Sequence, residues 1–377
     1  MIQPSPGINV IEGLRHARTI VPKRTEPFRR GFEAFTRQAT GMHPIKSTAK
    51  SVLEGLGAHW LGRSLYKHCA LILMYHGLTP AKTSPDWGQV PADKFEAQMH
   101  YLKSHYNVVT LARLLEMMAS RRVEPYTATV TFDEGYGSTN KVAYPILKKL
   151  GIPATVYLTT GFITPQHDPV RYIWSDYISV LLTSSGESKL DLRPWGSEEF
   201  DISDATRLYR ARRRISIHLK ALRTEDKDGV LKALEDRYAD RIDHAQFTDY
   251  HPMTWEEVGT LQREGLVGFG AHTRTHPILS RLDDRHLEDE MLGSRDDIRS
   301  RLGTAVDDFA FPSGRRVDIS PAALALARRE FKSAATTVSR LNRLGQDPHF
   351  LYRIGIGNDL QLPRFKVLIS GMYSFDK

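Results

Sequence analysis

The sequence predicts an α/β protein built on a parallel sheet or barrel. Short apolar or β-branched runs at residues 70–75, 129–132, 154–158 and 266–271 have the composition of buried strands. Amphipathic segments separate these runs, and strands that alternate with helices form parallel sheets through right-handed crossovers. At 377 residues the chain can bury a sizeable core in one large domain or two.

The N-terminal residues differ in composition from the rest of the chain. Residues 1–50 are rich in Pro, Thr and Arg, and apolar residues recur at helical spacing over 51–67. We interpret residues 1–69 as a basic arm with helices and residues 70–377 as the α/β domain. In the first half of that domain we expect strands at 70–75, 108–109, 129–132 and 154–158, with helices at 93–104, 111–120 and 138–150.

Residues 164–250 interrupt this alternation. They are polar, contain the basic run from Arg207 to Arg223, and predict an insertion of loops and helices that covers the site. The alternation then resumes with a helix from 255 capped by Thr254. After it we expect strands at 266–271, 309–311 and 333–338 and helices at 283–302 and 321–330. The last 30 residues show no clear pattern.

Charge and cysteine content limit the function classes. The net charge is +8, and residues 1–70 hold eleven Lys and Arg against four Glu. The arm is either a solvated, partly disordered extension or a peripheral contact with an anionic membrane surface. The basic residues are spread out without a recognised motif, so nucleic-acid binding is not expected. A single cysteine and the lack of a signal peptide or membrane-spanning stretch favour a cytoplasmic protein, membrane-associated if the arm binds lipid.

Two adjacent acids end the strand at 129–132. Asp133 and Glu134 are followed by Gly135, which permits a sharp turn. Active sites often lie at the carboxyl ends of parallel strands, and two converging carboxylates need a cation or a proton between them. The alternative is a helix N-cap with one additional solvated charge.

Two histidines end the strand at 266–271. His272 and His276 are four residues apart, so on a helical turn their imidazoles would converge on one ion. One carboxylate and two histidines leave open positions on zinc or a similar ion, as in catalytic sites. Such an ion would polarise a carbonyl and lower the pKa of its bound water, while the second carboxylate acts as general base. The alternative is a pair of solvated surface histidines.

These motifs resemble those of a known family. Thr131–Tyr136 is similar to Thr-Phe-Asp-Asp-Gly-Tyr, and His272–His276 matches His-Ser/Thr-x-x-His, both in the order and strand context of the polysaccharide deacetylases, carbohydrate esterase family four. Met74–His76 and Phe309–Gly314 are also similar to family segments. The resemblance implies a distorted (β/α) barrel of about seven strands. It also implies a metal-dependent enzyme that removes the N-acetyl or N-acyl group of an amino sugar in polysaccharide, glycolipid or glycoside biosynthesis.

The resemblance also implies residue roles. Asp133 matches the general base, and Glu134, His272 and His276 match the ligands of a divalent metal, with zinc expected and cobalt, nickel or iron as alternatives. The backbone near Ser313 matches the segment that binds the oxyanion. The expected partner is an N-acetylated amino sugar or a glycolipid.

The sequence departs from the family pattern at three places. Glu134 replaces an Asp, and its additional methylene shifts the carboxylate by about 1.5 Å in a site that needs tighter placement. Ala310 stands where many members have an Arg that orients the base, although Arg315 and Arg316 lie nearby. The C-terminal motif with a general-acid His is missing, and His76 is the candidate because it ends the first strand.

Trp174 and two alternative functions complete the predictions. Trp174 follows the strand at 154–158, and its indole either stacks on a sugar ring or begins the inserted helix as a buried residue.

Glu134 and the missing His favour a catalytically weak or inactive carbohydrate-binding pseudoenzyme as one alternative. A deformylase that acts on a lipid-linked sugar would use the same catalytic residues and is the other.

Overall fold

The computed structural model describes residues 58–372 except 82–85 and 167–169. The predicted arm therefore lies outside the described residues up to position 57. Within the predicted helix at 51–67, helix α4 spans Ala58–Leu65. Among the helices of the described ranges, none combines the length and apolar character that a bilayer crossing requires.

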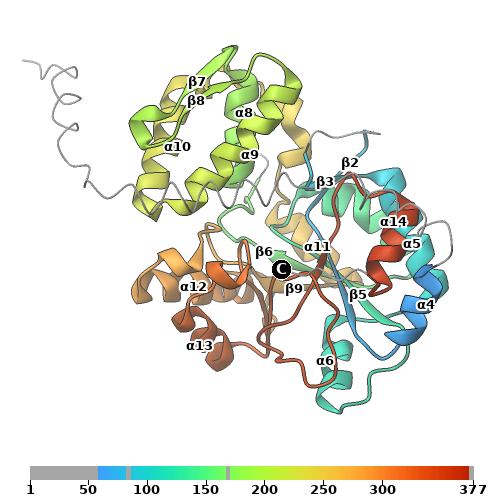
Figure 1. Ribbon diagram of the computed structural model, residues 1–377. Helices are drawn as coiled ribbons and strands as arrows, with labels where there is room; N and C mark the ends of the chain where they lie inside the picture. Colours follow the sequence, from blue (N-terminus) through green and yellow to red (C-terminus); the bar gives the residue numbers. More distant parts are fainter. Residues whose placement is uncertain (1–57, 82–85, 167–169, 373–377) are drawn as a thin grey trace, which may run out of the picture. The chain divides into compact units, whose positions relative to one another are not determined.

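A parallel sheet forms the centre of the fold (Figure 1). Its strands run in the order β11-β10-β9-β6-β5-β1-β12, and β4 pairs with the start of β5. Every neighbouring pair is parallel. The strands are β1 (Leu71–Tyr75), β4 (Asn107–Val108), β5 (Thr127–Phe132), β6 (Ala154–Leu158), β9 (Val267–Ala271), β10 (Asp308–Ala310), β11 (Ser333–Ala335) and β12 (Ile354–Gly355).

The segment around β12 links the two edges of the sheet. Leu351 forms a parallel bridge with Ala335 next to one edge, and Ile354 pairs with Leu73 of β1 at the other. The sheet is thereby curved into a distorted barrel. The predicted fold class is confirmed.

Side chains of the strands alternate between two cores. Ala128, Val130 and Phe132 of β5 belong to the main core under the surrounding helices. Residues of the opposite parity, such as Ile72 and Tyr157, form a second core together with residues of α6 (Leu111–Ala119). Both faces of the sheet are therefore covered, which explains why the predicted strands are almost continuously apolar or β-branched.

Most of the remaining helices of the barrel follow the predicted pattern. They are α5 (Ala92–His105), α7 (Tyr144–Leu150), α11 (Trp255–Glu264), α12 (Asp284–Leu302) and α13 (Pro321–Glu330). Helix α14 (Leu362–Ile369) lies in the last 30 residues and was not predicted. Thr254 and Glu257 form a capping box at the start of α11, and Asp283 caps α12. The predicted helix at 138–150 differs, because its first part is a π-helical turn, η2 (Thr139–Ala143). The short strands β2 (Gly77–Thr79) and β3 (Gln89–Pro91) were not predicted.

The insertion between β6 and α11 has a core of its own. It contains α8 (Trp174–Ser184), α9 (Ala205–Ala221), α10 (Thr224–Tyr238) and η5 (His244–Tyr250). It also contains a hairpin of β7 (Lys189–Asp191) and β8 (Glu199–Asp201), so the prediction of loops and helices alone was wrong. Leu190 and Phe200 of the hairpin pack on Ile215 and Leu234 of the helices.

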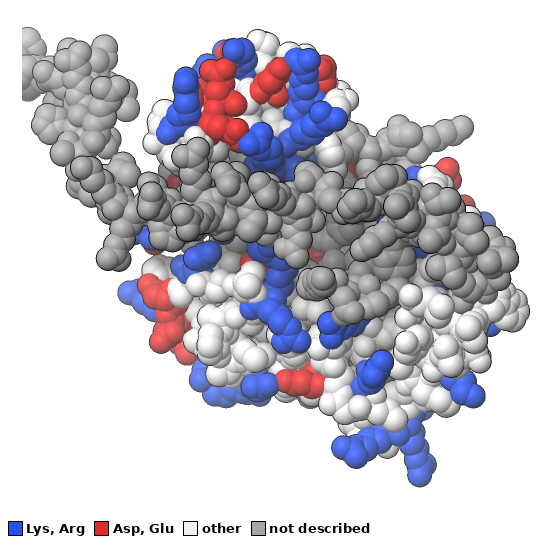
Figure 2. Space-filling model, in the orientation of Figure 1, with Lys and Arg blue, Asp and Glu red and all other residues white. Residues whose placement is uncertain are grey.

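Acidic and basic side chains lie next to one another over the insertion (Figure 2). Arg207, Arg214 and Arg223 of the basic run form ion pairs with Asp201, Glu198 and Asp226, respectively. The basic run therefore does not form an unbroken positive surface.

Candidate active site

Asp133 is fixed by a buried arginine. Arg353 donates from Nη1 to Asp133 Oδ1 at 2.6 Å and from Nη2 to Oδ2 at 2.7 Å, and its side chain is fully buried. Arg353 also donates to Thr131 Oγ1 and to the carbonyl oxygen of Thr336. Bidentate pairs of this kind fix a carboxylate in both position and orientation. Each carboxylate oxygen keeps a second lone pair that can accept a proton or a hydrogen bond.

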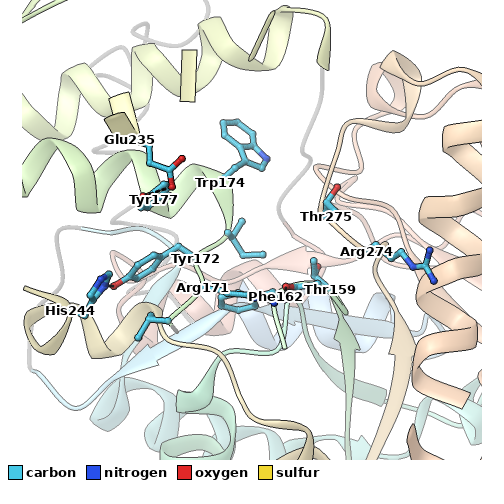
Figure 3. Close-up of a pocket in the computed structure, with 13 residues that line it drawn as sticks. Thr159, Phe162, Arg171, Tyr172, Trp174, Tyr177, Glu235, His244, Arg274 and Thr275 are labelled. Atoms are coloured by element: carbon cyan, nitrogen blue, oxygen red, sulfur yellow. Dashed lines mark hydrogen bonds between the residues drawn. The ribbon is translucent and has the colours of Figure 1, made fainter. Parts of the chain in front are cut away.

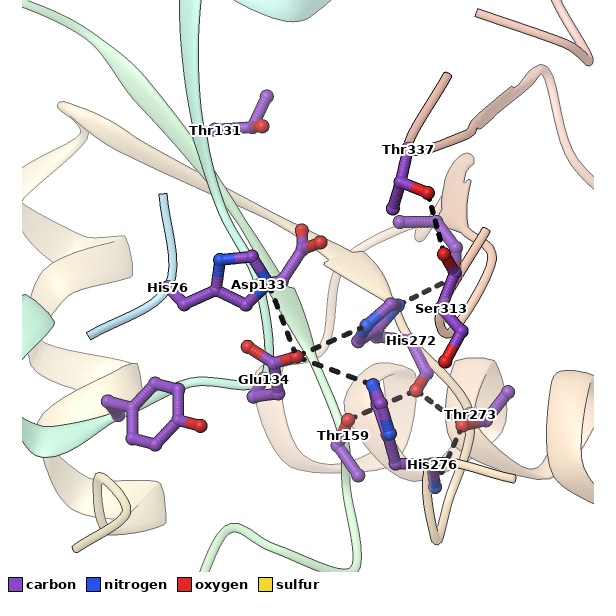
Figure 4. A network of polar contacts seen from close by, with 12 residues as sticks. His76, Thr131, Asp133, Glu134, Thr159, His272, Thr273, His276, Ser313 and Thr337 are labelled. Carbon is purple, nitrogen blue, oxygen red and sulfur yellow. Dashed lines mark hydrogen bonds and ion pairs between the residues drawn. The ribbon is translucent and has the colours of Figure 1, made fainter. Parts of the chain in front are cut away.

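Glu134 lies on the other side of the strand end and faces three imidazoles (Figure 4). Its Oε1 is 3.3 Å from Nε2 of His276, 3.8 Å from Nε2 of His272 and 3.9 Å from Nε2 of His76. Ligand atoms of Glu134, His272 and His276 all lie within 4.8 Å of one another, and all three residues are buried. The structure therefore brings together the predicted ligands from segments about 140 residues apart.

The donor set fits a divalent metal. Glu134 Oε2 and His276 Nδ1 are buried and have no hydrogen-bond partner in the described part of the chain. His272 Nδ1 lies 2.7 Å from the carbonyl oxygen of Ala310, so it donates there and its Nε2 keeps a lone pair toward Glu134. Two imidazole nitrogens and one carboxylate suit zinc, and also cobalt, nickel or iron.

The electrostatics of Glu134 and His276 favour the protonation states that bind a metal. Burial alone would raise the pKa of Glu134, but His76, His272 and His276 bring it well below its ordinary value. Burial lowers the pKa of His276. Burial also acts to lower the pKa of His272, but the charge of Asp133 and the contact with Glu134 outweigh this effect and raise it. An ionised carboxylate and a neutral His276 are the states that a cation requires.

The two segments that carry the candidate ligands, the turn after β5 and the segment from His272 to His276, contain residues with positive φ. Glu134 has φ +65° and Gly135 has φ +97°, so two successive left-handed residues turn the chain after β5. A Cβ at Gly135 would lie 2.7 Å from Ile163 Cδ1, so the predicted need for glycine is confirmed. The prediction that His272 and His276 share a helical turn was wrong. They lie in a loop with φ +66° at Thr273 and +60° at His276.

His76 and Ser313 also lie at this end of the barrel. His76 follows β1, its Nδ1 is buried without a partner, and its ring meets Trp87 edge-on at 5.9 Å between centroids. Ser313 has φ +57°, and its carbonyl oxygen accepts a hydrogen bond from Thr337 Oγ1 at 2.6 Å. Figure 4 shows both residues beside Asp133 and the histidines.

Trp174 is the first residue of α8 and is buried. Its Nε1 donates to the carbonyl oxygen of His276 at 3.2 Å. Of the two interpretations of Trp174, the structure agrees with the second, a buried residue at the start of the inserted helix. Through its hydrogen bond to His276, Trp174 also supports the loop that carries two of the candidate ligands.

Two sets of interactions near the site were not predicted from the sequence, that of Arg353 with Asp133 and that of Asp176 with Tyr136 and Arg212. Arg353 takes the place expected of Arg315 or Arg316, since Arg315 pairs with Asp318 and Arg316 donates to Tyr352. The only sequence signal for Arg353 is an arginine within the short apolar run at 351–356. The second set lies in a buried cluster in which Tyr136 donates to Asp176 at 2.5 Å, with Arg212 between Asp176 and Asp86. Burial and the charge of Asp86 raise the pKa of Asp176 to about 7.

Comparisons with known proteins agree with these motifs. The family model for polysaccharide deacetylases matches residues 120–181 and 230–330. YxkH of Bacillus subtilis strain 168, named for the polysaccharide deacetylases, is 32% identical over 98 residues, which are 26% of this chain and 34% of that protein. The poly-β-1,6-N-acetyl-D-glucosamine N-deacetylase of Staphylococcus aureus MSSA476 is 33% identical over 79 residues, 21% of this chain and 27% of that enzyme. The matched segments thus span about a third or less of these relatives.

Solved structures share the fold over most of the chain. The Streptococcus pyogenes deacetylase PplD, in complex with acetate, has a TM-score of 0.52 at 20% identity and covers 81% of this chain and 99% of its own. IcaB from Ammonifex degensii has a TM-score of 0.51 at 18% identity and covers 80% of this chain and 97% of its own. The family match, these folds and the order of the motifs lead to one conclusion. The chain belongs to the polysaccharide deacetylase family, carbohydrate esterase family four.

Proposed function

We propose that the protein is a metal-dependent deacetylase that hydrolyses the N-acetyl group of an amino sugar within a glycan or glycolipid. The observation that carries this proposal is the convergence of Glu134, His272 and His276 beside the anchored carboxylate of Asp133. A divalent ion held by these three residues would polarise the acyl oxygen and acidify a water molecule. A cytoplasmic location fits the single cysteine and completes the proposal.

The chain supplies the proton transfers of the reaction. Asp133 accepts a proton as water adds to the acyl carbon, and Arg353 keeps the carboxylate in place during that step. His76 lies 3.9 Å from Glu134 with its Nδ1 unpaired, and it donates a proton to the nitrogen as the C–N bond breaks. The backbone at Ser313 stabilises the oxyanion. The products are acetate and the free amino sugar.

Product release with and without metal tests the proposal. We expect metal-depleted protein to regain acetate release from N-acetylglucosamine oligomers when zinc, cobalt, nickel or iron is added, and Asp133→Asn to abolish it. Asp284→Asn, which alters an exposed carboxylate on α12, is the matched control and should retain full activity. Unchanged acetate release by Asp133→Asn would contradict the assignment of the base.

The same assay separates the two alternatives. Formate release from N-formylated, lipid-linked sugars without acetate release would favour a deformylase. The pseudoenzyme is favoured by Glu134, which stands where the family has Asp. It predicts sugar binding without any product and no thermal shift on addition of metal.

A further inference from the structure

Exposed apolar side chains are concentrated on and around helix α4. Nine large apolar side chains are exposed in the described part of the chain, and five of them lie here. They are Trp60, Leu61, Leu65, Leu344 and Met372, and the three on α4 are 58–66% exposed. Single exposed apolar residues are common, but a contiguous group of this kind marks a surface that binds a partner.

These five side chains form one surface, which we call the α4 patch. A Cβ at Gly62 of α4 would overlap Met372, so the segment after α14 lies against this helix. Ala70, between α4 and β1, forms an antiparallel bridge with Asn342, which places Leu344 beside the same segment. Three parts of the sequence therefore contribute to the patch.

Basic side chains border the α4 patch. Four of them are exposed and have no hydrogen-bond or ion-pair partner among the described residues: Lys67, Arg121, Arg122 and Arg343. The backbone N–H of Tyr126 donates to the carbonyl oxygen of Lys67 at 2.6 Å, so the 121–126 loop lies beside the end of α4. The guanidinium carbon of Arg63 lies 5.3 Å from the ring centroid of Trp60 and 4.8 Å from that of Tyr126.

Acidic residues do not neutralise this border. Residues 58–75 and 341–346 contain no Asp or Glu. Glu124 is the one acid in the 121–126 loop, and it accepts a hydrogen bond from Asn107 and pairs with Arg113. The α4 patch is therefore an apolar surface with a positively charged edge.

This chemistry fits an anionic lipid bilayer. Leu and Met side chains are stabilised among acyl chains, Trp favours the level of the head groups, and Lys and Arg attract anionic head groups. A glycan would offer hydroxyl groups, to which Leu61 and Leu65 can form no hydrogen bonds. Residues 1–57 hold nine Lys and Arg against four Glu, so their charge is repelled by the basic border and adds to the attraction toward an anionic surface.

The α4 patch and the candidate active site lie at opposite ends of the barrel. The patch adjoins the starts of β1 and β5, whereas Glu134 follows the end of β5, whose six residues span about 20 Å. The cavity lined by Thr159 and Thr275 is also at the end that carries the ligands (Figure 3). Figure 1 shows α4 and α6 in the lower half of the view and the inserted helices α8, α9 and α10 at the top.

We propose that the α4 patch is the surface through which the protein binds an anionic bilayer. Bound in this way, the barrel turns Glu134 and the histidine loop away from the lipid. For the proposed deacetylase, on which this last step rests, the orientation favours a sugar unit of an extended glycan over one attached directly to a lipid.

Sedimentation of the 377-residue chain with lipid vesicles tests the surface without any turnover. We expect binding to vesicles of phosphatidylcholine mixed with phosphatidylglycerol, and at least about tenfold weaker binding to phosphatidylcholine alone. The double variant Leu61→Ser/Leu65→Ser should bind the mixed vesicles at least about tenfold more weakly, because it removes apolar area that the bilayer buries. Lys67→Gln/Arg122→Gln should lose about tenfold at low salt and less at high salt.

Two variants outside the patch are matched controls and should bind as wild type does. Val317→Ser changes a side chain that is 72% exposed, and Arg281→Gln/Arg285→Gln removes two exposed cations near the start of α12. Melting temperatures check that every variant is folded. Equal binding by wild type and both patch variants would overturn the proposal and assign any vesicle binding to residues 1–57.

A second copy of the chain is the competing occupant of the patch. A wild type that ignores vesicles but forms a dimer, which Leu61→Ser/Leu65→Ser converts to a monomer, would overturn the lipid assignment. Acetate release from soluble N-acetylglucosamine oligomers tests the orientation, and we expect the same rate from vesicle-bound and free wild type. A loss of that rate on vesicle binding would overturn the orientation. If neither form released acetate, the deacetylase would be refuted, and sedimentation alone would decide the surface.

Discussion

Asp133 and Glu134 are adjacent in the sequence, but their carboxylates lie in opposite surroundings. Both oxygens of Asp133 accept hydrogen bonds from one fully buried guanidinium. In Glu134, one oxygen faces three imidazole nitrogens, and the other is buried without a partner among the described residues. The fold thus fixes the first acid completely and leaves ligand capacity on the second. This difference supports the roles that we propose for the two acids, a positioned base and a metal ligand.

Backbone strain is concentrated at Glu134 and in the loops around it, and it is absent at Asp133. Among the described residues, six that are not glycine have positive φ, and four of them are Glu134, Thr273, His276 and Ser313. Such conformations cost roughly 1–3 kcal/mol each and persist where the surrounding structure holds them for function. Asp133 lies at the end of a regular strand and carries no such strain.

The largest expected effect comes from breaking the Asp133 pair. Arg353→Met leaves a buried carboxylate without its partner, and we expect a loss of about 3–5 kcal/mol in the free energy of unfolding. Combining it with Asp133→Asn removes both charges and should restore much of that stability. Urea unfolding of the wild type, both single variants and the double variant measures the coupling. A loss below about 1 kcal/mol in Arg353→Met would show that the pair does not anchor the acid.

Metal affinity distinguishes the two acids next. Glu134→Gln removes an ionised ligand, and we expect metal to bind at least about 100-fold more weakly. Asp133→Asn should bind metal within about tenfold of wild type, because Asp133 faces Arg353 instead. Equilibrium dialysis with zinc and a competing chelator measures both constants. Equal losses in the two variants would abolish the distinction.

Asp176 extends the comparison to an acid that shares its arginine with a second carboxylate. Its pKa is raised to about 7 in the folded protein, well above the value of about 3.9 in an unfolded chain. The folded state therefore binds the additional proton, and this contribution to stability is complete below about pH 4 and lost as the pH rises through 7. We expect Asp176→Asn to remove a decline of roughly 2 kcal/mol between pH 5 and 8. An unchanged pH profile of urea unfolding would contradict this.

The smallest effect concerns the length of the second acid. Glu134→Asp withdraws the carboxylate by about 1.5 Å from imidazole nitrogens that already lie 3.3–3.9 Å away, and we expect kcat/KM to fall about tenfold. His272→Ala in the same assay provides the reference for a full loss of ligand. A rate above wild type in Glu134→Asp would show that the glutamate detunes the site.

Most of the barrel could be predicted because its signals are local. Apolar runs of strand length, helix caps such as Thr254 and Asp283, and glycines at turns depend only on neighbouring residues. The two motifs were predicted to meet because each ends a parallel strand. The pairing of Arg353 with Asp133 could not be predicted, because the two residues are 220 positions apart in the sequence. The strand that follows Arg353, β12, has only two residues, too few to give a recognisable strand pattern. The histidine loop was also missed, because spacing alone does not distinguish a helix from a strained loop.

The closure of the barrel has a consequence for biosynthesis. Arg353 lies in the segment that joins β11 to β1, 220 positions after Asp133. A polypeptide still emerging from the ribosome would contain Asp133, Glu134 and both histidines before it contained the guanidinium that restrains Asp133. The proposed base therefore gains its fixed orientation only after residue 353 has been synthesised and the barrel has closed.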